Sequence, residues 1–79
     1  MENKELSKPL AFLAIPNYPS AGDLWKLLAS CRVQRRRTQG DKDYPKECFG
    51  IKNTSEFLNE LIAHEEKLRA LLAGMGEIV

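Results

Sequence analysis

The sequence contains few cysteines, and they do not have the spacing of a metal site. Its two cysteines, Cys31 and Cys48, lie far apart with no C-x-x-C pair, which indicates neither a dense disulfide framework nor a zinc knuckle. His64 is the only histidine, and structural zinc sites take their ligands from closely spaced pairs rather than from isolated residues. We therefore expect reduced thiols, no bound metal and no cofactor.

A long apolar run and a charge excess of one sign are also missing. The apolar stretch Leu10 to Ile15 is far shorter than the roughly 20 residues that span a bilayer. The residues before it include Glu2 and Glu5, whereas the first part of a signal peptide is basic. The formal net charge is +1, which disfavours a protein whose main task is to coat nucleic acid or an anionic membrane. We expect a cytoplasmic protein without a membrane span.

The sequence shows no catalytic pattern either. A cysteine and His64 would form a nucleophile and a base, but no third orienting group, nucleophile elbow or oxyanion loop accompanies them. The five glycines stand singly at expected helix ends and turns, not together in a phosphate-binding loop. We therefore interpret the chain as a protein that is not an enzyme.

What the sequence does contain is typical of one small helical domain of 79 residues. Residues 20–38 are predicted to form a helix, because Ser20 followed by Asp23 is typical of an N-cap with an acid in the first turn. Apolar residues then recur at helical spacing on one face, namely Leu24, Leu27, Leu28 and Cys31, with Trp25 at its margin. Residues 1–19 form an N-terminal segment, in which residues 7–15 are predicted as either a short helix or a strand.

Residues 39–52 have no sustained period and are rich in Gly, Asp, Lys and Pro, so they are predicted as a loop. A second helix is predicted over residues 53–74, with Asn53 as its cap, Glu56 at the capping-box position and Gly74 at its end; residues 75–79 form a tail. Its apolar stripe is broad and consists of Phe57, Leu58, Leu61, Ile62, Leu68, Leu71, Leu72 and Met75.

The predicted fold is all-α: an antiparallel hairpin of the two helices with the N-terminal segment packed across it. Such a small domain buries only about 60% of the surface that its unfolded chain exposes. Two helices do not cover the whole stripe, so we expect a homodimer or an obligate partner to complete the fold. The predicted partner or dimer face is apolar and comprises Trp25, Leu61, Leu68, Leu72 and Met75.

Positive charge is concentrated at the end of the first helix, in Arg32, Arg35, Arg36 and Arg37. In an antiparallel hairpin these arginines lie near Glu56 and Glu60, in surface pairs of about 0 to 1 kcal/mol each. A second pair is expected between Glu65 and Arg69, four residues apart on the second helix. The arginines are also the only local charge excess, and guanidinium groups suit both carboxylates and phosphates.

The sequence thus predicts a non-catalytic interaction module, a stoichiometric regulator, inhibitor or adaptor that binds another protein with an acidic surface. The predicted polar contact residues are Arg32, Arg35, Arg36, Arg37 and Tyr44, within and near the stretch 41–47. By analogy, a small chain that lacks a catalytic pattern resembles the small phage or mobile-element proteins that disable a host factor. The alternative is a nucleic-acid-binding regulator whose arginines contact phosphates, although no interleaved aromatic residues are present to stack on bases.

Overall fold

The computed structural model describes residues 12–79; the predicted N-terminal segment before Phe12 lies outside the described residues. The first long helix, α2 (Ala21–Gly40), begins at a capping box. The Ser20 hydroxyl accepts a hydrogen bond from the Asp23 N–H, and the Asp23 carboxylate accepts one from the Ser20 N–H. These bonds lower the pKa of the Asp23 carboxyl. The predicted helix start is confirmed, and the helix ends slightly beyond the predicted residue 38.

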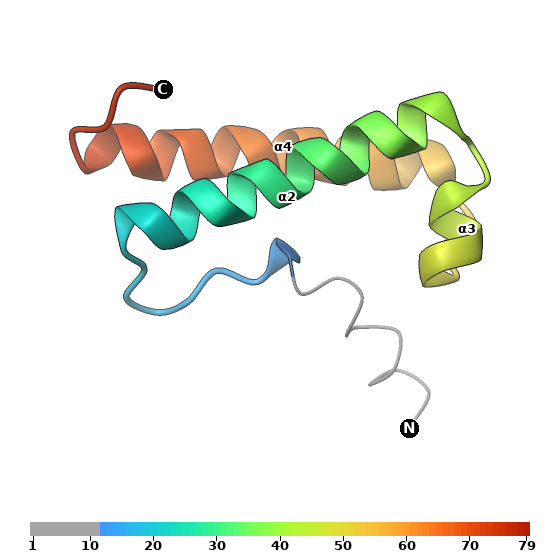
Figure 1. The fold of residues 1–79 in the computed structure, drawn as a ribbon, viewed down its shortest axis with the longest axis horizontal. Helices are drawn as coiled ribbons and strands as arrows, with labels where there is room; N and C mark the ends of the chain where they lie inside the picture. Colours follow the sequence, from blue (N-terminus) through green and yellow to red (C-terminus); the bar gives the residue numbers. More distant parts are fainter. Residues whose placement is uncertain (1–11) are drawn as a thin grey trace.

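The second long helix, α4 (Thr54–Gly74), begins where the Asn53 side chain accepts a hydrogen bond from the Glu56 N–H. α2 and α4 lie side by side and run in opposite directions, and they form most of the molecule (Figure 1). No strand occurs in residues 12–79. The prediction of an all-α fold is therefore confirmed for the described part of the chain.

The prediction of a loop over residues 39–52 is wrong in its middle, because this stretch contains a short helix, α3 (Tyr44–Phe49). Pro45 occupies the first turn of α3, where its missing N–H costs no helical hydrogen bond. Gly50 ends the helix with a φ of 72°, a left-handed conformation that glycine adopts without strain. A helix of only six residues is too short to produce a visible hydrophobic period.

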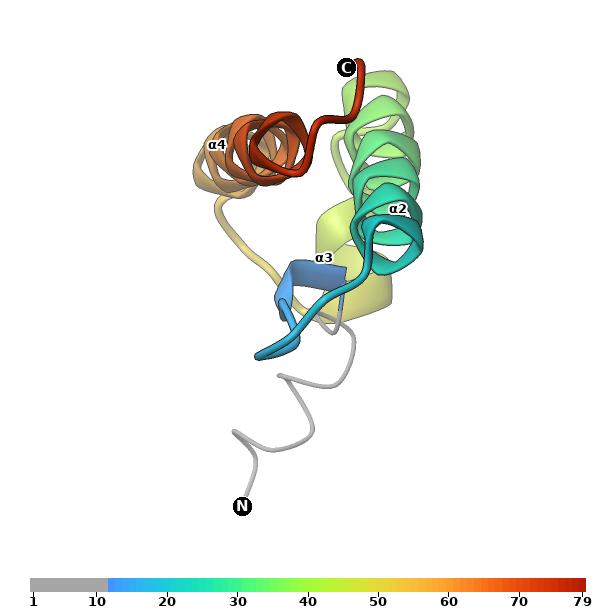
Figure 2. The ribbon, with the colours of Figure 1, turned by 90° about the vertical axis from the view of Figure 1, so that its left-hand side faces the viewer.

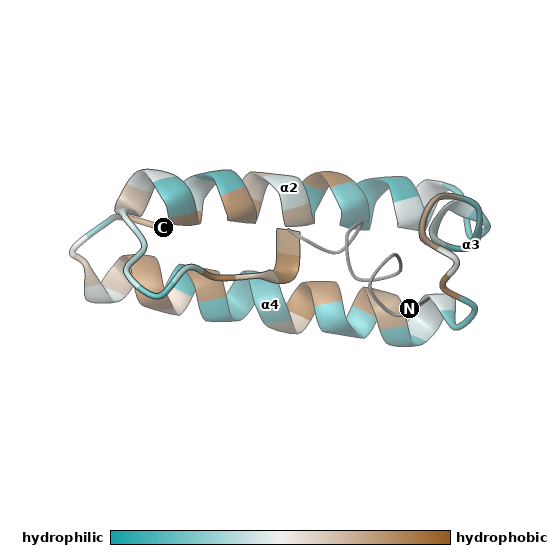
Figure 3. Ribbon diagram, turned by 90° about the horizontal axis from the view of Figure 1, so that it is seen from below, coloured by the Kyte–Doolittle hydropathy of each residue, from teal (hydrophilic) through white to brown (hydrophobic). Residues whose placement is uncertain are grey.

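Residues 12–20 pass along one side of the helix pair, on the same side as α3 (Figures 2 and 3). Phe12 and Leu13 form a 3₁₀ turn; most of the stretch 7–15, for which a short helix or a strand was predicted, lies outside the described residues. Phe12, Leu13 and Ile15 are partly buried against the core. We call this side of the α2–α4 pair the covered face.

The core lies between the two long helices and consists of Leu24, Leu28, Cys31, Phe57, Leu61, Leu68 and Leu72. The prediction that Leu61, Leu68 and Leu72 face a partner is wrong, because each is 0% exposed within the single chain. Their covering comes from α2 and from Phe12, Leu13 and Ile15 of the same chain, which pack against this core. Ile62 and Met75 remain 43% and 46% exposed.

A cluster of aromatic rings fixes the covered face. The Phe49 ring centroid lies 5.8 Å from that of Phe12, 5.9 Å from that of Phe57 and 5.6 Å from that of Tyr44. Tilted and edge-on contacts at such distances stabilise beyond the burial of apolar area alone. The cluster therefore joins residues 12–13, α3 and the start of α4 to one core.

Candidate protein-binding surface

Helical geometry divides the charged residues of α2 between two sides. Gln34 faces α3, because its side-chain oxygen accepts a hydrogen bond from the Tyr44 hydroxyl. With 3.6 residues per turn, a residue two positions away points to nearly the opposite side of a helix. Arg32 and Arg36 stand two positions on either side of Gln34, so they point away from the covered face.

The same geometry applies to α4. His64 lies beside Leu13 on the covered face, and Ile62, two positions earlier, therefore points to the opposite side. Leu58 and Arg69 share this side with Ile62, because they are four and seven positions from it, and Glu66, also four positions from Ile62, lies beside Arg69 at its edge. The two helices thus present Arg32, Arg36, Leu58, Ile62 and Arg69 on one surface, which we call the arginine face.

One arginine of the cluster is held within the chain. The Nε and a terminal nitrogen of Arg35 donate to the two carboxylate oxygens of Glu65 at 2.6 and 3.3 Å. The Arg35 side chain is 27% exposed and that of Glu65 10%, and the hydrogen bond raises the pKa of Arg35. Such a two-point pair is stronger than an ordinary surface contact.

This ion pair corrects two expectations. Its carboxylate is Glu65, which lies farther along α4 than the expected Glu56 and Glu60, and Glu65 is engaged by Arg35 and not by Arg69. Glu65 occupies two of the five N–H donors of Arg35, so Arg35 ties α2 to α4, and its role as a contact residue stays a prediction. The pair also fixes the register of α2 on α4, which the sequence alone did not give.

Arg37 and Tyr44 lie together on the covered side. The guanidinium carbon of Arg37 is 5.9 Å from the centroid of the Tyr44 ring, within the range of a cation–π contact. Tyr44 is half-buried, donates its hydroxyl proton to Gln34 and packs against Phe49. Both predicted contact residues are therefore engaged in internal contacts, unlike Arg32 and Arg36.

Besides Arg37, which contacts the Tyr44 ring, three arginines remain without an ionic partner inside the described chain. Arg32, Arg36 and Arg69 have no carboxylate within 4.0 Å among residues 12–79. Arg32 lies one turn before Arg35, toward the start of α2, and Arg69 lies one turn after Glu65, toward the end of α4. Because the helices are antiparallel, these two guanidinium groups belong to the same level of the molecule. Their positive charges therefore add on this surface.

Apolar side chains lie next to these arginines. Ile62 is 43% exposed and Leu58 is half-buried. Trp25, at the far end of the same side of α2, is half-buried and its ring N–H donates to the Glu77 carboxylate at 3.1 Å. Exposed arginine beside aliphatic and aromatic surface is the composition that characterises the energetic centre of protein interfaces.

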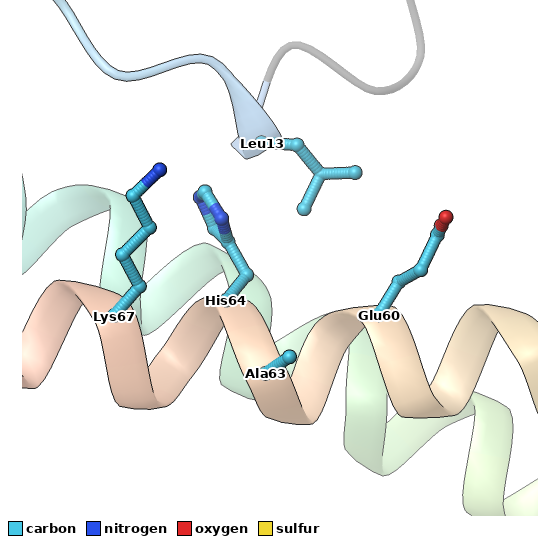
Figure 4. Close-up of a pocket in the computed structure, with 5 residues that line it drawn as sticks. All are labelled: Leu13, Glu60, Ala63, His64 and Lys67. Atoms are coloured by element: carbon cyan, nitrogen blue, oxygen red, sulfur yellow. The ribbon is translucent and has the colours of Figure 1, made fainter.

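A second candidate site is a shallow hollow of about 300 Å³ on the covered face, lined by Leu13, Glu60, Ala63, His64 and Lys67 (Figure 4). The Nε2 atom of His64 is buried, and no described residue bonds to it. Burial, followed by the neighbouring Lys67 charge, lowers the pKa of His64. Glu60, four positions before His64, forms no ion pair with it among residues 12–79. The hollow therefore presents a neutral imidazole to mainly apolar surroundings.

The two thiols lie in different environments. Cys31 is fully buried, and its Sγ donates to the Phe12 carbonyl at 3.6 Å. Burial, with a smaller contribution from the Glu65 charge, raises the pKa of this thiol to about 11, so it stays protonated near neutral pH. Cys48 is exposed on α3. Within residues 12–79, no three potential metal ligands come together.

Comparisons with protein-family models, curated proteins and solved structures found no match to this chain. None of the helices in residues 12–79 combines the length and the apolar character needed to cross a membrane.

Proposed function

We propose that this chain is a non-catalytic binding protein, a small regulator, inhibitor or adaptor, and that it docks an acidic protein through the arginine face. The observation that carries the proposal is that Arg32, Arg36 and Arg69 have no carboxylate partner among residues 12–79, close to Ile62, which is 43% exposed. Like charges held together on a surface repel, and carboxylates of a partner would replace this repulsion with charge-assisted hydrogen bonds.

A partner of different sequence suits this face better than a second copy. A two-fold dimer brings the same patch of both copies together, so each arginine cluster would meet another arginine cluster. The original reason for expecting a homodimer is also weaker, because Leu61, Leu68 and Leu72 are buried within the chain. We therefore propose a complex with a protein that presents Asp and Glu side chains.

The test is affinity capture from the native host's lysate, with nuclease added in one arm. Wild type is compared with Arg32→Glu/Arg36→Glu and with a matched control, Lys46→Glu/Lys52→Glu, which reverses two exposed charges outside the arginine face. The proposal expects a protein that resists nuclease, is lost with the arginine variant and is kept with the lysine variant. Equal loss with both variants would contradict it, and capture that depends on intact nucleic acid would favour phosphate binding instead.

A further inference from the structure

We infer that the partner element that docks on the arginine face is an acidic amphipathic α-helix, which lies lengthwise against α2 and α4 as a third helix. This inference rests on the proposed function and specifies the shape and chemistry of the docked element.

The backbone of the face excludes a docked strand. An extended peptide that binds by strand addition needs an exposed row of N–H and C=O groups on its receptor. α2 and α4 are continuous helices of 20 and 21 residues, and the N–H and C=O groups inside a helix bond to one another. The face therefore offers side chains only, and side-chain ridges are what a third helix packs against.

The spacing of the side chains suits a helix of about three turns. Leu58 and Ile62 are one turn apart on α4, as are Arg32 and Arg36 on α2. From Leu58 to Arg69 the face extends about 17 Å at 1.5 Å per residue. Rows of residues four apart form the ridges and grooves by which two helices interlock. Apolar residues at i, i+4 and i+7 of a partner helix would cover Leu58 and Ile62 over this length.

The charges indicate where the acids of the partner lie. The apolar residues Leu58 and Ile62 belong to α4, Arg36 on α2 stands near the level of Ile62, and Arg32 and Arg69 lie farther toward the end of α4. A partner helix centred on the apolar pair thus has Arg36 beside one flank, and Arg32 and Arg69 beyond one end. Asp or Glu at these positions would form bonds that neither a second copy of this chain nor a basic peptide can form.

The test is selection of randomised 20-residue peptides on display against the full chain, with sequencing of the enriched pool. We expect enriched peptides with apolar residues at i, i+4 and i+7, flanked by Asp and Glu. Synthetic copies should gain helical circular dichroism on binding. They should bind at least about tenfold more weakly to Arg32→Gln/Arg36→Gln/Arg69→Gln and to Ile62→Ser, but equally to Lys46→Gln/Lys52→Gln.

The outcomes separate this inference from the proposed function. Enrichment of acidic peptides that depend on the arginines but show no helical spacing or helix gain would overturn the helix and leave the acidic partner in place. Enrichment of peptides without acids, or of none at all, would overturn both. Concentration-dependent dimerisation in light scattering that Ile62→Ser abolishes would assign the face to a second copy and overturn the inference as well.

Discussion

The two faces of the α2–α4 pair differ in how many of their side chains find packing or ionic partners within the chain. On the covered face, residues 12–20 and α3 lie over the helices, and the aromatic rings of Phe12, Phe49 and Phe57 pack together. On the arginine face, three guanidinium groups lack a carboxylate among residues 12–79, and Ile62 remains 43% exposed. One face of this small fold thus packs against the rest of the chain, and the other is the face that we propose for binding.

The Arg35–Glu65 pair lies between the two faces and belongs functionally to the first. It places a nearly buried carboxylate against a guanidinium at 2.6 Å and so fixes the register of the helices. Arg36, the next residue, is exposed. Neighbouring arginines in one run therefore differ in their contacts within the chain, and substitutions can separate their effects.

The largest difference between the faces is expected when Phe57→Ala and Ile62→Ala are compared for their loss of unfolding free energy. Phe57 is 2% exposed and contacts Phe12 and Phe49, so its loss should lower the free energy of unfolding by about 3–5 kcal/mol. Ile62→Ala should cost less than about 1.5 kcal/mol, because much of its side chain is already in water. Urea denaturation of both variants measures this, and similar losses would show that Ile62 is part of the core.

The sequence alone was sufficient to predict the parts of the fold that depend on local signals. Ser20 with Asp23 and Asn53 with Glu56 marked both helix starts, because a cap is a contact between residues close in sequence. The helical period of the apolar residues likewise identified Leu24, Leu28 and Phe57 on the inner faces. α3 was missed because its signal, Pro45 in a first turn and Gly50 at the end, is brief and also typical of turns.

The candidate surface was only partly predictable. The arginine run identified Arg32 and Arg36, but it did not separate them from Arg35, whose partner Glu65 is 30 residues away in sequence. The prediction of contact residues did not include Leu58, Ile62 and Arg69. Leu58 and Arg69 are four and seven positions from Ile62, a helical spacing that the sequence already contains. Which flank of α4 stays open depends on where residues 12–20 pass, and no local pattern specifies that.

Removal of the Arg35 side chain is expected to have the next largest effect. In Arg35→Ala, the Glu65 carboxylate stays in a site where it is only 8% exposed, without its guanidinium. A buried group that loses its hydrogen-bond partner typically costs about 1–3 kcal/mol. Urea denaturation should show this loss for Arg35→Ala but not for Arg36→Ala. Recovery in the double variant Arg35→Leu/Glu65→Leu would support the ion pair as the cause.

The covered face should also respond to acid. Because the folded protein lowers the pKa of His64 below its ordinary value of 6.5, the unfolded chain binds a proton more readily than the folded protein between the lowered value and 6.5. The free energy of unfolding should therefore fall as the pH falls through this window. Glu60 and Lys67 also line this hollow, so the slope is compared between wild type and His64→Gln. An unchanged slope in His64→Gln would assign the acid response to carboxylates elsewhere.

The smallest effect on stability is expected where the effect on binding should be greatest. Arg32→Gln/Arg36→Gln/Arg69→Gln removes three positive charges that have no partner in the described chain, and surface changes of this kind usually stay within about 0.5 kcal/mol each. Relief of the repulsion between them should move the net change toward higher stability, most clearly at low salt, where charges are screened least. Thermal unfolding at low and high ionic strength measures both. A loss of stability as large as that of Arg35→Ala would mean that these arginines hold the fold together, and the arginine face would then belong to the structure instead of to a partner.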